Sequence, residues 1–499
     1  MSRWSAPRPV HIVAGFAGYR QRMDTARDRL EIEDAVDRLL GGRRPSFRQP
    51  PAPVDLRDYV SGDAPQEPQA PVEARIESDA ALRRAVFFVP RHGGLDAAAL
   101  RTRALDEGAR RGGSSGELPR AIPGMPRRGA FALAAGEGLQ RRESFVELLD
   151  WRDLPDAAMP TALRSGYLAL ARTGWTYLRT GALGRLLRLN RAATLVAAAR
   201  AGGLALQALL ALSIGVIGGR TIAEGLSGLA SASGLPNWPV MFLAGFAGAS
   251  AVILVLRICR ARDPELLAYH AIRSLAYLSS RRGAYPAELD RRISAFAGRI
   301  GWALRQDVDE VLVVGHGDGA ALAVSAVAEA VRWGDLPDGA PALSVLTLGQ
   351  TIPLVGFLPE ASRLRADLRD LSLREDVCWV DLSDPADARA YALSDPVAVC
   401  GVALDDRTGP LVLASSLGRL SGEGWRDRLA ANPLALHDRY LDVPAKPARD
   451  FDWLRVLLGP LPLRTLLGGR PPAPGRIDVR GTAYAATARP RPAPEEDDD

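Results

Sequence analysis

The 499-residue chain contains few cysteines and almost no lysine, and both scarcities limit what the composition can say about its class and function. Its three cysteines, Cys259, Cys378 and Cys400, are far apart and form no CxxC or Cys/His cluster, which argues against a disulfide framework or a zinc site. Lys446 is the only lysine, so nearly all of the 63 basic residues are arginine, a bias typical of GC-rich codon usage. The net charge of +5 therefore does not by itself indicate a function that depends on arginine side chains.

Several common motifs are also missing from the sequence. Residues 1–20 have no long apolar core followed by a small-residue cleavage site, so no signal peptide is expected. There is no G-x-x-x-x-G-K-[ST] loop and no nucleic-acid-binding motif, so we expect no cofactor, no metal and no nucleic-acid partner. The excess of basic over acidic residues then favours a membrane surface as the partner.

Long hydrophobic runs are present, and they are the strongest signal in the chain. Ala201–Gly219 and Trp238–Leu256 carry no charged residue, and only Arg220 and Glu224 are charged between them. A bilayer core of about 30 Å needs roughly 20 helical residues, which both runs supply. The sequence therefore predicts a hairpin of two transmembrane helices joined by a connection at about 220–237. The alternative is a buried helical hairpin in a large soluble domain.

Arginines on either side of the runs predict the orientation of this hairpin. The loop between the runs has one arginine offset by one glutamate, whereas both outer flanks are basic. The positive-inside rule then places both flanks, and the N- and C-terminal regions, in the cytoplasm. Gly215 and Gly219, and likewise Ala244 and Gly248, have the i, i+4 spacing that permits close helix approach. The flanking arginines are Arg179, Arg185, Arg188, Arg191, Arg200, Arg257, Arg260 and Arg262.

The rest of the chain divides by composition. Residues 1–80 form a mixed segment with a Pro-rich linker, and residues 466–499 a Pro/Arg-rich tail with an acidic end that we expect to be disordered. Between them we expect one discontinuous α/β domain, 81–160 and 257–465. An Arg-rich membrane-proximal helix (161–200) and the hairpin (201–256) interrupt it.

Short apolar runs separated by helical patterns predict the fold of that domain. Such alternation is typical of a mostly parallel sheet with helices on both faces. The clearest helices are 264–280, 286–306 and 319–333. The expected strands are Ala85–Pro90, Phe145–Leu149, Glu310–Gly315, Ser344–Gly349, Val377–Leu382 and Pro410–Ala414.

One strand-to-helix turn has the sequence pattern of a catalytic motif. The run Val311–Val314 is followed by Gly315-His316-Gly317-Asp318-Gly319 and then a helical pattern. This resembles the G-x-S-x-G nucleophile elbow of the α/β-hydrolase family, in its G-H-S-x-G form. Gly317 occupies the nucleophile position, and a glycine has no side chain with which to attack a carbonyl. Asp318 is an alternative nucleophile, and a phosphate-binding turn is an alternative reading of the glycines.

The resemblance implies further site residues. His92-Gly93-Gly94 matches the family's oxyanion turn, with the amide of Asp318 as the second donor. The triad acid is expected after the strand Val377–Leu382, at Asp395 in a D-P-V sequence or at its rival Asp387. His437, the only histidine after His316, takes the place of the catalytic histidine.

The chain as a whole resembles uncharacterised bacterial membrane proteins of the α/β-hydrolase superfamily, over about residues 80–460. The resemblance implies a multi-pass protein of the bacterial inner membrane, with α/β-hydrolase-like topology, that contacts lipid and binds a small acyl or lipid ligand. Because Gly317 replaces the serine, we expect a catalytically inactive homologue with a binding or scaffolding role. An active esterase or lipase that uses another nucleophile or activated water, and a purely structural membrane protein, remain alternatives. The oligomeric state is left open.

Overall fold

The computed structural model describes residues 82–115, 119–122, 129–136, 141–158, 163–233, 236–262, 268–334, 336, 339–415, 435–442 and 451–489. The predicted N-terminal segment (1–80) and the acidic end of the chain lie outside these residues. The chain divides into two compact units. The sheet unit comprises Met1–Trp151, Ala287–Pro353 and Ser362–Asp499, and the helical unit comprises Arg152–Pro286 and Leu354–Ala361.

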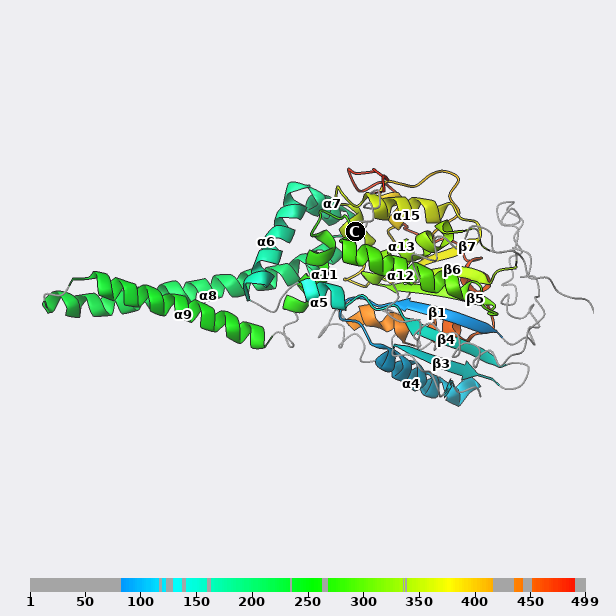
Figure 1. Cartoon of the computed structure of the whole chain (residues 1–499), viewed down its shortest axis with the longest axis horizontal. Coiled ribbons are helices and arrows are strands. Elements are labelled where there is room, and N and C mark those ends of the chain that lie inside the picture. Colours follow the sequence, from blue (N-terminus) through cyan, green and yellow to red (C-terminus); the bar gives the residue numbers. More distant parts are fainter. Residues whose placement is uncertain are drawn as a thin grey trace, which may run out of the picture. The chain divides into compact units, whose positions relative to one another are not determined.

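An eight-stranded, mostly parallel sheet forms the centre of the sheet unit, in the order β2-β3-β4-β1-β5-β6-β7-β8 (Figure 1). Only β3 runs antiparallel to its two neighbours. The six predicted apolar runs are β1 and β4–β8, which confirms the α/β class, whereas β2 and β3 were not predicted. The strands are β1 (Arg83–Val89), β2 (Arg120–Ile122), β3 (Ala130–Ala135), β4 (Arg142–Leu148), β5 (Glu310–His316), β6 (Ala342–Leu348), β7 (Val377–Ser383) and β8 (Leu411–Ala414).

Helices cover both faces of this sheet, so its parallel strands are apolar on both sides. On one face, alternate residues such as Val86, Leu312 and Val380 pack against α4 (Ala97–Ser115) and α19 (Trp453–Leu458). On the other face lie α12 (Ala287–Ala303), α13 (Gly319–Arg332) and α15 (Ser362–Ser372) (Figure 1). The short helices are α14 (Ile352–Gly356), α16 (Pro396–Val399), α20 (Leu463–Leu467) and the 3-10 helix η3 (Ala435–Leu441).

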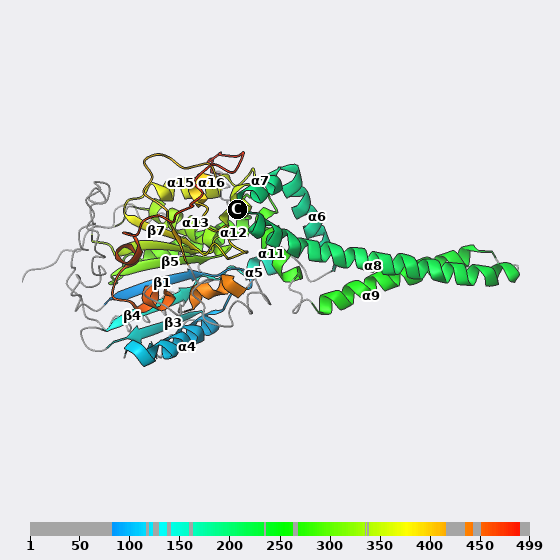
Figure 2. The same ribbon diagram turned by 180° about the vertical axis from the view of Figure 1, so that it is seen from behind.

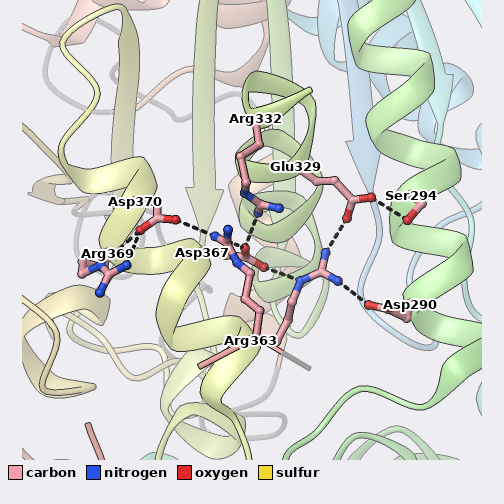
Figure 3. A network of polar contacts seen from close by, with 9 residues as sticks. Asp290, Ser294, Glu329, Arg332, Arg363, Asp367, Arg369 and Asp370 are labelled. Atoms are coloured by element: carbon pink, nitrogen blue, oxygen red, sulfur yellow. Dashed lines mark hydrogen bonds and ion pairs between the residues drawn. The ribbon is translucent and has the colours of Figure 1, made fainter. Parts of the chain in front are cut away.

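An ion-pair network joins α12, α13 and α15 (Figure 3). Arg363 pairs with Asp290, Glu329 and Asp367, so one guanidinium serves all three helices. Arg332 also pairs with Asp367, at 2.6 Å between Nη2 and Oδ1. Because each buried carboxylate has a guanidinium partner, the network fixes the helical layer without leaving an uncompensated charge.

The predicted disordered tail is wrong for residues 466–489, which have fixed partners. The amide of Ala473 donates to Val412 O at 2.9 Å, and Ile477 bridges to Ser394. Further along, Arg489 pairs with Asp370 and Asp367 in the network above. The Pro- and Arg-rich composition suggested disorder, but main-chain hydrogen bonds and ion pairs, which composition does not report, hold this stretch on the sheet unit.

In the helical unit, the predicted membrane-proximal helix is divided. It forms α6 (Leu163–Arg179), α7 (Ala182–Leu189) and the first turns of α8 (Arg191–Ala232). The break between α6 and α7 falls at Gly181, whose φ of 66° lies in the left-handed region that glycine tolerates. The unit also contains α5 (Asp153–Ala158) and α11 (Ala268–Ser279).

The two predicted spans lie in α8 and α9 (Trp238–Ala261), which run side by side (Figures 1 and 2). Both helices are long and apolar enough to cross a membrane, by length and composition. The predicted connection at 220–237 is wrong in extent, because α8 continues to Ala232. An ion pair one helical turn apart, Arg220 Nε to Glu224 Oε1 at 2.6 Å, supports the added turns.

Small residues form the crossing of α8 and α9, as their spacing predicted. A Cβ on Gly215 would lie 2.3 Å from Val252 Cγ2 and 2.7 Å from Gly248 O. A Cβ on Gly219 would lie 3.0 Å from Ala244 O. The two backbones therefore approach more closely than larger side chains would allow.

Candidate functional site

The predicted elbow lies at the carboxyl edge of β5, between that strand and α13. Gly317 at its apex has a φ of 58°. Its amide donates to Leu348 O at 3.0 Å, and its carbonyl accepts the amide of Thr351 at 3.2 Å. Both main-chain groups of the apex are thus held at the end of the neighbouring strand β6.

The flanking glycines are required by close backbone contacts. A Cβ on Gly315 would lie 2.6 Å from Ala320 Cα, and a Cβ on Gly319 would lie 2.4 Å from Val89 O. Real Cβ atoms do not come so near to backbone atoms, so no larger residue fits without movement of the chain. Small residues at these two places are what a strand-turn-helix elbow demands.

His437 and Asp387 meet beside this apex. His437 Nδ1 lies 2.7 Å from Asp387 Oδ2, and both side chains are buried. The Tyr440 hydroxyl donates to the same Asp387 oxygen at 3.1 Å and accepts the amide of Asp384 at 2.8 Å. With Nδ1–H donating to the carboxylate, the Nε2 atom of His437 carries the lone pair.

That Nε2 atom faces the missing side chain of Gly317. A Cβ placed on Gly317 would lie 2.9 Å from His437 Nε2 and 3.1 Å from Arg91 Cβ. The histidine therefore stands where it could accept a proton from a hydroxyl attached to the apex. The apex supplies only hydrogen at that point.

Of the two predicted acid positions, only Asp387 contacts His437. Asp395 instead caps α16, where its Oδ1 accepts the amides of Val397 and Ala398 at 3.0 and 3.1 Å. Its Oδ2 lies 2.6 Å from the guanidinium of Arg407. The choice of Asp395 is thus corrected to Asp387, since an aspartate before Pro396 is a common helix N-cap.

The predicted oxyanion turn follows β1, the strand next to β5 in the sheet. Two of its three amides already have acceptors within the protein. The His92 amide donates to Asp318 Oδ1 at 2.9 Å, and the Gly94 amide donates to Arg91 O at 2.8 Å. The Asp318 carboxylate is therefore bound to this turn, which does not suit the alternative in which it is the nucleophile.

Arg91 lies beside Gly317, and His316 lies against His437. Arg91 makes two hydrogen bonds to Asp438, at 2.8 and 3.0 Å. The His316 ring stacks on His437 with centroids 4.8 Å apart, and its Nε2 lies 2.9 Å from His437 O. Burial, together with the electrostatic influence of His437 and Arg91, holds the pKa of His316 well below its ordinary value, so His316 is neutral.

The environment of Asp387 favours its charged form. Burial alone would raise the pKa of this carboxyl, but its electrostatic interaction and hydrogen bond with His437, with further hydrogen bonds from Arg389 and Tyr440, outweigh burial and lower it. Burial raises the pKa of Tyr440 well above its usual value, and so does the neighbouring charge of Asp387. The site therefore holds an ionised acid, a neutral phenol and a histidine oriented by both.

Sequence patterns missed several residues of the site. Tyr440 follows His437 by three residues, which places both on one side of a 3-10 helix, but no sequence signal predicted that helix. Gly349 has a φ of 53°, and a Cβ on it would lie 2.7 Å from Tyr440 Cε2 and 3.1 Å from His437 Cε1. Among the described residues, no group of three or more His, Cys, Asp or Glu could hold a metal ion.

Comparison of the chain with known protein families, with curated proteins and with solved structures finds no match.

Proposed function

We propose that this chain is a membrane-anchored α/β-hydrolase-like protein that is inactive as a serine hydrolase and acts by binding. The observation that carries the proposal is the place of Gly317: its missing Cβ would lie 2.9 Å from the Nε2 of a histidine oriented by a buried aspartate. The elbow and its acid–histidine pair are present together, without the group that would form an acyl intermediate.

Two further contacts support inactivity. The amides of His92 and Gly94 are engaged within the protein, so neither is available to stabilise an oxyanion in this conformation. The Asp318 carboxylate is occupied by the same turn. A small acyl or lipid compound is the ligand class that suits such a frame.

The membrane part of the proposal rests on α8 and α9. Their outward faces carry large apolar side chains, such as Phe242 at 73% exposure, Leu206 at 68% and Ile217 at 65%. Water would disfavour this surface by roughly 25 cal/mol per Å², whereas lipid would not. With the arginines at the outer flanks, the hairpin is assigned to the inner membrane of a bacterium, with the sheet unit in the cytoplasm.

A second candidate function is hydrolysis by an activated water. The intact Asp387–His437 pair favours it, because Nε2 could take a proton from water as it would from serine. The protein would then remove an acyl group without a covalent intermediate.

The test is turnover by the purified full chain in detergent or nanodiscs. A panel of acyl esters and a fluorophosphonate probe would be applied to the wild type and to His437→Ala. We expect no labelling and no hydrolysis above buffer for either protein. Turnover that His437→Ala abolishes, without probe labelling, would replace the proposal with the water mechanism, and labelling of the wild type would overturn both.

The anchor is tested separately, by extraction of membranes with alkaline carbonate. The full chain should stay in the pellet. A variant that lacks 201–256 should be released, and release of the full chain itself would contradict membrane insertion.

A further inference from the structure

Helix α6 exposes large apolar side chains along one face. The most exposed are Trp175 at 63%, Leu178 at 62% and Leu168 at 53%. Together with Arg172 they are spaced by three or four residues, so they lie on one side of the helix. A face of this kind, with tryptophan, leucine and arginine, is typical of helices that lie in a membrane interface.

The opposite face of α6 is fixed within the helical unit. Thr173 and Tyr177 are buried there, and the Tyr177 hydroxyl donates to Leu354 O at 2.7 Å. Tyr167 and Leu170 pack near Leu204 of α8 and Ala276 of α11. A rotation of α6 that buries its exposed face would break the contacts of the opposite face. The exposed face is therefore outward in the folded unit.

Along the chain from α6 to the middle of α8, charge has one sign. From Ala157 to Ala223 the sequence has eight arginines and no aspartate or glutamate. The structure gives no carboxylate partner, among the described residues, to the guanidiniums of Arg172, Arg179, Arg188 and Arg191. In the sheet unit, by contrast, arginines such as Arg299 and Arg363 have buried carboxylate partners. Uncompensated arginines suit anionic lipid headgroups, at about 1 kcal/mol for each.

The chain path ties α6 to the first span. Only Thr180, Gly181 and Asn190 separate the ends of α6, α7 and α8. Figure 1 shows α6 running across the direction of α8 rather than along it. A helix that crosses the direction of a membrane span lies along the membrane plane, where interfacial tryptophan and arginine are most favourable.

We propose that α6 lies in the cytoplasmic interface of the membrane, with Leu168, Trp175 and Leu178 among the lipids and Arg172, Arg179 and Arg188 on anionic phosphate headgroups. This inference rests on the proposed membrane anchor. It adds a lipid class and a defined contact surface that a pair of spanning helices does not require.

The experiment uses the full chain, one copy per nanodisc, and its tryptophan fluorescence. Lipids brominated on the acyl chain quench only tryptophans that enter the bilayer or its interface. Three single variants assign the quenching: Trp238→Phe reports the span, Trp175→Phe reports α6, and Trp333→Phe is the control on the sheet unit, where Trp333 is also exposed.

We expect Trp238→Phe and Trp175→Phe each to lower the quenched fraction, and Trp333→Phe to leave it unchanged. Loss of quenching in Trp238→Phe alone would overturn the inference about α6 and leave the anchor standing. It would indicate that a protein surface, or water, covers that face. No change in any variant would contradict the anchor itself.

The charge requirement is tested with two lipids at equal mole fraction, brominated phosphatidylglycerol and brominated phosphatidylcholine. The wild type should be quenched several-fold more strongly through Trp175 by the anionic lipid. The triple variant R172Q/R179Q/R188Q should lose that preference, and R172K/R179K/R188K should keep it. Equal quenching of the wild type by both lipids would contradict the headgroup assignment.

Discussion

The elbow and the crossing of α8 and α9 are both built on glycines, yet they differ in what surrounds them. At the elbow, Gly315 and Gly319 let a strand, a turn and a helix pack together inside a core where Val311–Val314 are fully buried. At the crossing, Gly215 and Gly248 let two helices approach, but side chains a turn away point outward and are exposed. The same close approach therefore lies inside a buried core in one region and beneath an exposed apolar surface in the other.

The two regions also treat charge differently. The sheet unit buries ionisable groups with partners, as at Asp387 and Arg363. The described ion pairs of the helical unit lie at its surface, at Arg220–Glu224, Arg273–Asp156 and Arg282–Glu360. Several of its arginines on α6, α7 and the start of α8 have no carboxylate partner among the described residues. Charge in the first region is paired inside the protein, whereas the second region keeps several arginines on its surface.

The largest expected effect is at the elbow. Gly319→Ala would bring a Cβ to 2.4 Å from Val89 O and 2.6 Å from Pro90 O, both backbone atoms. We expect a loss of about 3 kcal/mol or more in the free energy of unfolding, as for overpacked core sites. Gly334→Ala, with no atom within 4 Å of its Cβ, is the matched control. Equal thermal unfolding of the two variants would refute the close packing at this turn.

A buried carboxyl on β7 gives the next effect. Burial raises the pKa of Asp381 to about 8, and a hydrogen bond from Thr347 only partly offsets it. Because the folded-state pKa is above that of the unfolded chain, the contribution of Asp381 to stability is complete below about pH 4 and is lost as the pH rises through 8. Asp381→Asn should therefore stabilise the protein by about 2 kcal/mol at pH 8 and by less at pH 5. A stability difference that does not change with pH would show that Asp381 is ionised throughout.

The helix crossing should respond less strongly than the elbow. Gly215→Val would force α8 and α9 apart, and we expect a loss of about 1–2 kcal/mol in stability of the hairpin in nanodiscs. Gly218→Val on the same helix, with open space at its Cβ, should be neutral. Equal resistance of both variants to heat and to proteolysis would contradict the observed packing of the two helices.

The smallest effect is expected at the ion pair of α8. Glu224→Gln removes the ion-pair partner of Arg220. In the proposed hairpin this pair would lie near the outer interface, where a long arginine side chain can extend into water without a carboxylate partner. We expect less than about 1 kcal/mol, measured as a small fall in the fraction of chain that resists carbonate extraction. A complete loss of insertion would mean that Arg220 lies deep in the bilayer.

The sequence predicted the parts of this molecule that repeat a strong local pattern. Fully apolar strands such as β5, the elbow glycines and His437 were found in this way. The strands β2 and β3 were missed because Arg120–Ile122 is very short and the Ala-rich Ala130–Ala135 does not alternate. Asp395 was preferred to Asp387 because a D-P-V pattern marks both a helix cap and the family's acid, and only the fold separates them. Long-range contacts decided each of these cases.

The most direct test of the proposed hydrolase-like site is to introduce a serine hydroxyl at the apex of the elbow. Gly317→Ser places the side chain beside His437 Nε2, at a strained φ and with Arg91 Cβ close by, so Gly317→Ala serves as the control for fold and strain. Phosphonylation by a fluorophosphonate is then mapped by mass spectrometry. We predict labelling at residue 317 in Gly317→Ser, none in Gly317→Ala, and loss of labelling when His437→Ala or Asp387→Asn is added. A folded Gly317→Ser protein that stays unlabelled would contradict the proposal that this site is a hydrolase site without its nucleophile. Labelling that persists when His437→Ala is added would contradict it as well.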